Sequence, residues 1–359
     1  MSLKIKEYLL PQYAKDDGLM KISGYTTVRN VIEMDYPFEE AIRSVLAFAD
    51  EVVVLDSTGQ KHSDGTSERL NEMSKEEPRI KHIRHDFDWM APNHGIFDGQ
   101  AKALARSYCT GAYLWQFDVD EIVHEVHAEM VRPFIRKLDW KGFDLVALPV
   151  IDLWGCDKIR IDVSLWKLRL SLNKPEITHG IPLALRKYEN GLLYARQGTD
   201  GCDYVGKDTG EGFTFASYAP AQVEKLRLAA VRDASAIPEI ESFVNKSLAN
   251  IPAVFHYSWF NIKRKIQNYK QFWDTSWKSL YNEDRDERAN PMFPGKLWSE
   301  VTDEMITAYA KDLEEKTCGH VFHRPWDGSS ANGIKINLSH PAIAQKWIDK
   351  QKQGRMPLS

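Results

Sequence analysis

The stretch LWQFDVDEIV, residues 114–123, sets an apolar run directly against three acidic side chains. The run at 113–117 predicts a buried strand. Asp118, Asp120 and Glu121 follow it, and packing gives no reason for them at a strand end because unpaired charges resist burial. Mg²⁺ and Mn²⁺ bind carboxylate oxygens and often share them with substrate phosphates. Taken alone, the stretch fits a solvated strand end or a metal site, and the residues upstream favour the metal site.

Upstream of this stretch, short apolar runs alternate with helical patterns. We expect strands at 21–31, 51–56 and 79–84, and helices at 38–50, from residue 66, and at 100–112. The run at 51–56 is typical of a parallel strand that is covered on both faces. This β-α-β-α-β-α-β order predicts an α/β fold with a Rossmann-like, mostly parallel sheet flanked by helices. Ligands of such sheets bind beyond the carboxyl ends of the strands, where Asp56, Asp118 and Asp120 fall.

The second half of the chain gives less regular patterns. We expect a strand at 143–151, short antiparallel strands and loops at 164–220, and helices at 262–280 and 301–316. These patterns suggest one domain at 1–220, with a first half at about 20–125 and a second half at about 126–220. A mainly helical region at 221–359 would complete the site.

Composition narrows the class of protein. The chain has 359 residues, of which 43% are hydrophobic and 27% charged, as in globular proteins. The net charge of −4 argues against a dedicated nucleic-acid binder. Four scattered cysteines, the lack of a signal-peptide core and the lack of a long apolar run lead us to expect a cytoplasmic protein. The basic, aromatic helix at 262–280 suits either a peripheral membrane contact or an amphipathic core helix.

Four motifs together resemble the GT-A glycosyltransferases, specifically the inverting family 2 type that includes lipopolysaccharide-core glucosyltransferases. In chain order they are TTVRN at 26–30, ADEVVVLDS at 49–57 followed by SDGT at 63–66, DGQAK at 98–102, and DVDE at 118–121. The resemblance covers residues 22–125 well and 126–280 weakly. It implies that 1–220 is a catalytic domain, with a nucleotide-sugar half at about 20–125 and an acceptor half at about 126–220. It implies a GT-A fold and metal-dependent transfer of a sugar from a UDP- or GDP-linked donor to a glycan, lipid-linked or other hydroxyl acceptor.

The resemblance also implies roles for single residues. Asp56 would accept a hydrogen bond from the nucleotide base, and Asp118 would approach the ribose. Asp120 would hold the Mn²⁺ or Mg²⁺ that bridges the diphosphate, with Asp118 and His256 as further ligands, although a histidine between two aromatic residues is more often a packing residue. The full set expected to contact the nucleotide-sugar is Thr27, Arg29, Asp56, Asp64, Gln100, Lys102, Asp118 and Lys263. Lys102 replaces the usual arginine, which keeps the charge and loses the bidentate geometry.

An inverting displacement also needs a carboxylate that takes the proton of the acceptor. The acidic residues considered are Asp152, Glu176, Asp200, Asp203 and Glu211. We favour Asp200 or Asp203, because each lies in a glycine-flanked loop.

Two other functions stay open. A sugar nucleotidyltransferase shares the α/β sheet and the metal carboxylates, but the loop at 27–31 lacks the glycines of its phosphate loop. A non-catalytic carbohydrate-binding protein on the same fold would have no need for the intact Asp118 and Asp120 pair.

Overall fold

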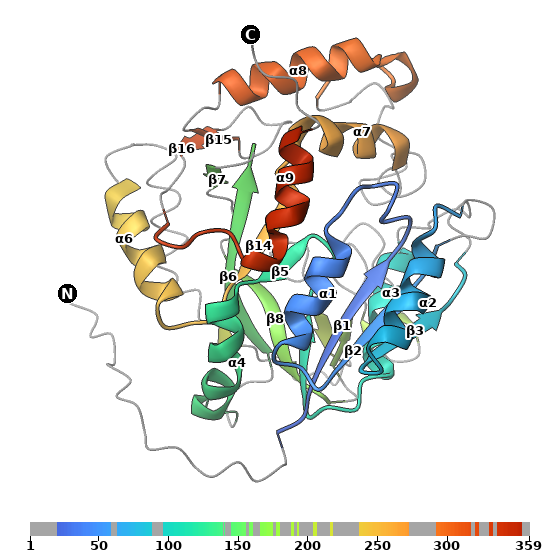
Figure 1. The fold of residues 1–359 in the computed structure, drawn as a ribbon, viewed down its shortest axis with the longest axis vertical. Coiled ribbons are helices and arrows are strands. Elements are labelled where there is room, and N and C mark those ends of the chain that lie inside the picture. Colours follow the sequence, from blue (N-terminus) through green and yellow to red (C-terminus); the bar gives the residue numbers. More distant parts are fainter. Residues whose placement is uncertain are drawn as a thin grey trace.

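The centre of the protein is a mixed sheet with helices on both faces, as the computed structural model shows (Figure 1). This arrangement confirms the predicted α/β fold class. The structure describes residues 20–58, 63–87, 96–138, 140, 145–155, 158–160, 166–174, 177–179, 188–189, 192–193, 204–206, 216–217, 237–272, 292–316, 320–322, 330–332 and 336–353.

The main sheet joins four parallel strands to a mixed half. Its spatial order is β3 (Ile80–Arg84), β2 (Glu51–Asp56), β1 (Ile22–Val28), β4 (Tyr113–Gln116), β8 (Trp166–Leu172), β6 (Leu145–Trp154), β14 (Val254–Trp259) and β5 (Glu121–Val123). The strands from β3 to β4 are parallel, and β8 is antiparallel to both of its neighbours. The short strands β7 (Lys158–Arg160) and β13 (Ala216–Ser217) also pair with β6. Separate pairs are formed by β9 (Ile177–His179) with β12 (Tyr204–Gly206), β10 (Tyr188–Glu189) with β11 (Leu192–Leu193), and β15 (His320–Phe322) with β16 (Ser330–Asn332).

The helices fall close to the predicted ranges in the first half of the chain. The described helices are α1 (Phe38–Leu46), α2 (Thr66–Glu76), α3 (Ile96–Ser107), α4 (Glu125–Lys137), α6 (Ile237–Leu248), α7 (Ile262–Phe272), α8 (Asp303–Lys316) and α9 (Gln345–Gln353), with 3₁₀ turns η4 (Trp298–Glu300) and η5 (Ala342–Ala344). The sequence patterns did not predict α4 and α9.

Strand β2 shows why the sheet formed by the first half of the chain has helices on both faces. All six residues of β2 are buried. Val52 and Val54 face the larger core, which includes residues of α1, whereas Val53 and Leu55 face a smaller core that contains Ala101 of α3. The alternation follows from the two-residue period of a strand, and it explains why this strand is apolar throughout rather than on one side.

Strand β14 brings a late part of the chain into the middle of the sheet. It lies between β6 and β5, pairing in parallel with β6 and antiparallel with β5. In this register His256 lies across from Asp152 on one neighbour and Glu121 on the other. Residues beyond 220 therefore contribute to the central sheet as well as to the helices that surround it.

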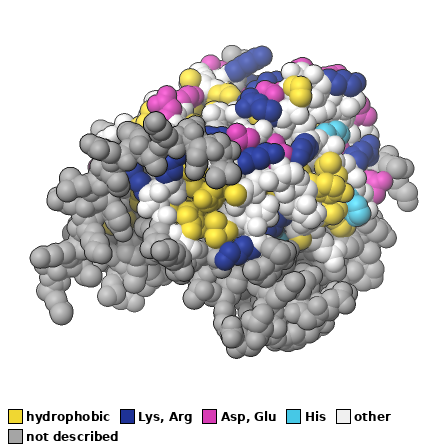
Figure 2. Space-filling model, turned by 90° about the horizontal axis from the view of Figure 1, so that it is seen from below, with side chains coloured by type: hydrophobic (Ala, Val, Ile, Leu, Met, Phe, Trp, Pro, Cys, Tyr) yellow, Lys and Arg dark blue, Asp and Glu magenta, His cyan; other side chains and the backbone are white. Residues whose placement is uncertain are grey.

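The C-terminal helices cover the end of the sheet at the top of Figure 1. Helices α7 and α8 share a second core that includes Trp259, Ile262 and Ile306. In the part of the chain that the structure describes, no helix has the length and apolarity needed to cross a membrane. Figure 2, seen from below, shows basic and acidic side chains mixed with small hydrophobic groups on the described surface.

Candidate active site

The acidic residues of the DVDE motif lie where the topology predicts, beyond the end of β4. Gln116 ends β4, and Glu121 begins β5, so residues 117–120 form the connection between the two strands. The Glu121 amide donates to the Asp118 carbonyl at 2.9 Å, which closes this connection into a tight turn. The Tyr257 amide donates to the Asp120 carbonyl at 2.8 Å, so β14 holds the turn from the other side.

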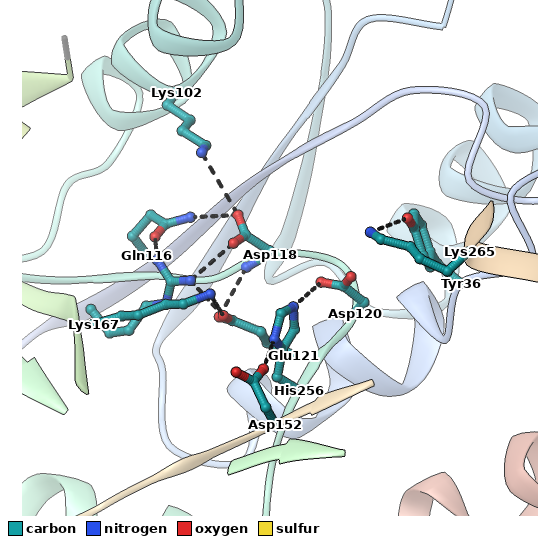
Figure 3. Close-up of polar contacts among 11 residues, drawn as sticks. Tyr36, Lys102, Gln116, Asp118, Asp120, Glu121, Asp152, Lys167, His256 and Lys265 are labelled. Atoms are coloured by element: carbon teal, nitrogen blue, oxygen red, sulfur yellow. Dashed lines mark hydrogen bonds and ion pairs between the residues drawn. The ribbon is translucent and has the colours of Figure 1, made fainter. Parts of the chain in front are cut away.

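Asp120 faces His256 across this junction. Their atoms Oδ1 and Nε2 are 3.5 Å apart, and Asp120 is only 7% exposed. The other ring nitrogen of His256, Nδ1, forms a short hydrogen bond with Asp152 of β6 (Figure 3). Asp152 therefore fixes the orientation of the imidazole and directs Nε2 toward Asp120. A carboxylate behind a histidine is the usual arrangement around metal-ligating imidazoles.

The two carboxylates set the charge of His256 when no cation is bound. Burial and the nearby charge of Lys167 both oppose protonation, but Asp120 and Asp152 outweigh them and raise the pKa of His256 to about 9. The pKa of Asp120 is lowered: burial opposes its ionisation, but the nearby charge of His256 outweighs burial. At neutral pH the unliganded pair is therefore an imidazolium beside a carboxylate.

Asp118 points away from this pair into a separate network. Its Oδ2 accepts from Arg169 at 2.9 Å, and its Oδ1 accepts from Gln116 at 3.1 Å and lies 3.8 Å from the ammonium of Lys102. Figure 3 shows the Asp118 and Asp120 carboxylates directed apart. Although burial opposes ionisation, Arg169 and Lys102 hold the pKa of Asp118 well below its usual range. Lys102, which is expected to contact the nucleotide-sugar, lies beside the Asp118 carboxylate in this structure.

The chemistry of the Asp120 and His256 pair fits a divalent cation. Ligands next to each other around one Mg²⁺ ion are about 3 Å apart, close to the observed Oδ1–Nε2 distance. Among the described residues, no three His, Cys, Asp or Glu side chains converge as a metal-binding group. A bound ion would therefore take most of its ligands from water and substrate. Mg²⁺ sites that use one or two protein ligands together with substrate phosphates have this composition.

Helix α7 supplies a cation to the same region, from a residue other than the one predicted. Lys263 is exposed, whereas Lys265 is half-buried and its positive charge acts on Asp120. The Lys265 ammonium lies 3.3 Å from the Tyr36 hydroxyl, and its distances to the ring centroids of Tyr36 and Tyr269 are 5.7 and 5.3 Å. Such aromatic contacts hold an ammonium in place while leaving its charge unneutralised.

The remaining predicted residues of the nucleotide half lie around the ends of β1 and β2. Asp56 is fully buried, and its carboxylate accepts from the Thr58 amide, the Ser67 hydroxyl and His82 Nε2. Although burial opposes ionisation, these hydrogen bonds lower the pKa of Asp56. The Thr58 hydroxyl is a fourth donor to this carboxylate, so its roughly four acceptor positions are all in use.

Two further residues of this half lie at the loop after β1. Asp64 accepts from the Thr66 and Glu33 amides, which ties the start of α2 to this loop. Burial lowers the pKa of Arg29 to about 10, so it stays cationic at neutral pH in a partly desolvated position. Thr27, on β1, and Gln100, on α3, are half-buried.

Some predicted residues lie outside the described part of the chain, and some residues of the site were not predicted. Asp200 and Asp203, predicted as catalytic bases, lie outside the described residues, as do Glu176 and Glu211. The sequence reasoning missed Lys167, Arg169 and Lys265. The signal for the first two is the alternation in β8, WKLRLSL, where basic residues at every second position predict one polar and one apolar face.

No protein-family model and no curated protein sequence matches the chain. Among solved structures, S. aureus TarS 1–349 in complex with UDP-GlcNAc is 15% identical, with a TM-score of 0.33 over 88% of this chain and 100% of that one. Glucosyl-3-phosphoglycerate synthase from Mycobacterium tuberculosis, in complex with Mn²⁺, UDP and glucosyl-3-phosphoglycerate, is 21% identical, with a TM-score of 0.27 over 38% of this chain and 45% of that one. At these identities and TM-scores, the function has to be argued from the chain's own residues.

Proposed function

We propose that this protein is a metal-dependent glycosyltransferase that moves a sugar from a nucleotide-diphospho donor to a hydroxyl acceptor. The observation that carries the proposal is the facing pair of Asp120 and His256 beyond the strand ends, with Asp152 behind the imidazole. A pair of this kind suits a divalent ion that is shared with a diphosphate. The four motifs of the nucleotide half support the same activity.

Each group near the pair has a task in this reaction. Asp120 and His256 would hold Mn²⁺ or Mg²⁺, which as a Lewis acid stabilises the charge on the leaving diphosphate. Lys265 places a further positive charge beside Asp120, where it can bind a phosphate oxygen. His256 must be neutral to act as a ligand, so it gives up its proton when the site is filled.

The proposal also assigns residues that would contact the nucleoside and the acceptor. Asp56 and Arg29 would contact the base and ribose, as the family resemblance implies. Asp118, which would approach the ribose, is fixed by Arg169 and Lys102. Asp200 or Asp203 would take the acceptor's proton, which would give inversion at the anomeric carbon. We propose UDP or GDP as the nucleotide of the donor and a glycan or a lipid-linked molecule as the acceptor.

Calorimetric titration with UDP and with GDP, each with Mn²⁺ or with EDTA, tests the donor site. We expect one nucleotide to bind only with Mn²⁺, and Asp120→Asn to abolish that binding while the melting temperature changes little. The matched control is Asp312→Asn on α8, since this acidic residue lies far along the chain on a helix of the second core. Equal nucleotide affinity in Mn²⁺ and in EDTA would contradict the proposal.

A screen for hydrolysis of UDP- and GDP-sugars then tests the chemistry. Release of nucleoside diphosphate and free sugar is the expected result, because water replaces a missing acceptor. Release of pyrophosphate from a nucleoside triphosphate and a sugar phosphate would instead identify a nucleotidyltransferase.

A further inference from the structure

Arg169 is the buried cation that ties the DVDE turn together. It is 3% exposed, and its guanidinium reaches three acceptors, one at the end of β4, one in the turn that follows and one at the start of β5. It donates to Asp118 Oδ2 at 2.9 Å and makes short hydrogen bonds to the side chains of Gln116 and Glu121. An arginine fork can hold several oxygens in a fixed geometry, which a lysine ammonium cannot do.

This network occupies Asp118 and Glu121 and leaves Asp120 out. Glu121 is fully buried; its Oε1 contacts Arg169, and its Oε2 accepts from the Asp118 amide at 3.2 Å. The nearest further cation to Glu121 is Lys167, at 3.9 Å. Of the three carboxylates in the turn, the structure shows only Asp120 facing His256.

We infer that Arg169 is a positioning residue that keeps Asp118 and Glu121 out of the metal's ligand set, so that Asp120 is the single acidic ligand from the turn. The inference rests on the proposed function. A metal with few protein ligands keeps positions for the donor's phosphates, and a metal with three carboxylates would bind tightly without them. Arg169 thereby makes metal binding depend on the nucleotide.

A purely structural role for Arg169 predicts a different outcome. Glu121 is a buried carboxylate, so removing its partner destabilises the turn in either case. If Arg169 only supports the fold, its removal weakens both metal and nucleotide binding along with stability. If Arg169 restrains Asp118, its removal strengthens the binding of metal alone, because the partly exposed Asp118 carboxylate, two residues before Asp120, becomes free to turn toward the metal.

The test compares Arg169→Met with the wild type, and the double variant Arg169→Met/Glu121→Gln with Glu121→Gln alone. The double variant removes both members of the buried pair, which avoids leaving an unpaired charge and keeps the comparison usable if the single variant does not fold. The conservative Arg169→Lys retains the charge without the fork. Mn²⁺ binding without nucleotide is measured by calorimetry and by the electron paramagnetic resonance signal of free Mn²⁺, and UDP or GDP binding in Mn²⁺ is measured separately.

We expect each arginine-to-methionine variant to bind Mn²⁺ alone about tenfold more tightly than its control, as added ligand charge does at oxygen sites. Nucleotide affinity in Mn²⁺ should fall, and Arg169→Lys should lie between the wild type and Arg169→Met in both measurements. Unchanged or weaker Mn²⁺ binding in both methionine variants overturns the inference. A wild type that binds neither nucleotide in Mn²⁺ overturns the proposed function, whatever the Mn²⁺ comparison between variants shows.

Discussion

The stability of the sheet should depend on the ionisation of Glu51, at the start of β2. Its side chain is 6% exposed and accepts from Ser23 and Thr110, and it forms an ion pair of 2.6 Å with Lys81. Burial opposes its ionisation, but these donors outweigh it and lower the pKa of Glu51 to about 2, from an ordinary 4.5. Because the native pKa is the lower one, the charge stabilises the fold above pH 4.5, and the stabilisation is lost as pH falls toward 2.

The magnitude follows from the difference between the two pKa values. It corresponds to about 3 kcal/mol at neutral pH and to about 1.4 kcal/mol at pH 3, where the unfolded chain already binds the proton. Glu51→Gln should remove this amount, measured by urea unfolding at pH 7, 5, 4 and 3. Subtracting the wild type at each pH cancels the other carboxylates.

A matched surface control distinguishes buried from exposed charge. Glu77, whose pKa Arg79 also lowers to about 2, forms its ion pair at the surface. The effect of Glu77→Gln should disappear in about 1 M salt, whereas that of Glu51→Gln should persist, because salt screens exposed pairs far more than buried ones. A Glu51→Gln effect that is constant from pH 7 to pH 3 would refute the reasoning.

Four further outcomes are expected. His256→Ala should abolish Mn²⁺-dependent nucleotide binding, and Asp152→Asn should weaken it by about 10- to 100-fold without removing a ligand, as seen in calorimetric titration. Lys265→Met should lower the affinity for the donor nucleotide about tenfold in the same assay, consistent with one lost charge-assisted hydrogen bond; if Lys263→Met causes the loss instead, the diphosphate lies on the other side of α7. Gly111→Ala should destabilise the fold by about 1–3 kcal/mol in thermal unfolding, because a Cβ there would lie 2.7 Å from the Ser23 amide nitrogen; an unchanged melting temperature would show that this turn can move.

The nucleotide half could be predicted because its signals are local. In β2, the continuous apolar run predicts a strand that is buried on both faces, and Asp56 at its end marks the edge of the sheet where a ligand would bind. The place of Asp118 and Asp120 follows from the same logic, since parallel strands end at one edge. The prediction needed no knowledge of which residues far along the chain lie nearby.

The other half of the site depends on pairings that are distant in sequence. His256 acquires its chemical role from Asp152, 104 residues earlier, and from Asp120 on the opposite side. Arg169 reaches Asp118 from 51 residues away. No sequence periodicity predicts such pairings. The alternation of polar and apolar residues in β8 fits a solvent-exposed face equally well, and only the pairing of β8 with β4 shows that its basic residues lie at the site.

Helix α7 shows a different limit of sequence reasoning. Lys263 and Lys265 are both basic neighbours of the apolar stripe, but successive residues in an α-helix are about 100° apart, so the two side chains lie about 200° apart around the axis. Only the packing of Ile262 and Ile266 into the second core, together with the position of Tyr36, decides which lysine faces Asp120.

The charges around the turn explain why such a site would need both a metal and a nucleotide. Four carboxylates, namely those of Asp118, Asp120, Glu121 and Asp152, lie among four fixed cations, namely Lys102, Lys167, Arg169 and Lys265. With His256 neutral these charges balance, so a divalent ion alone would leave two positive charges in a largely buried region. A donor diphosphate carries two negative charges and removes the excess. The cost of burying unbalanced charge thus favours metal and nucleotide binding together over either one alone.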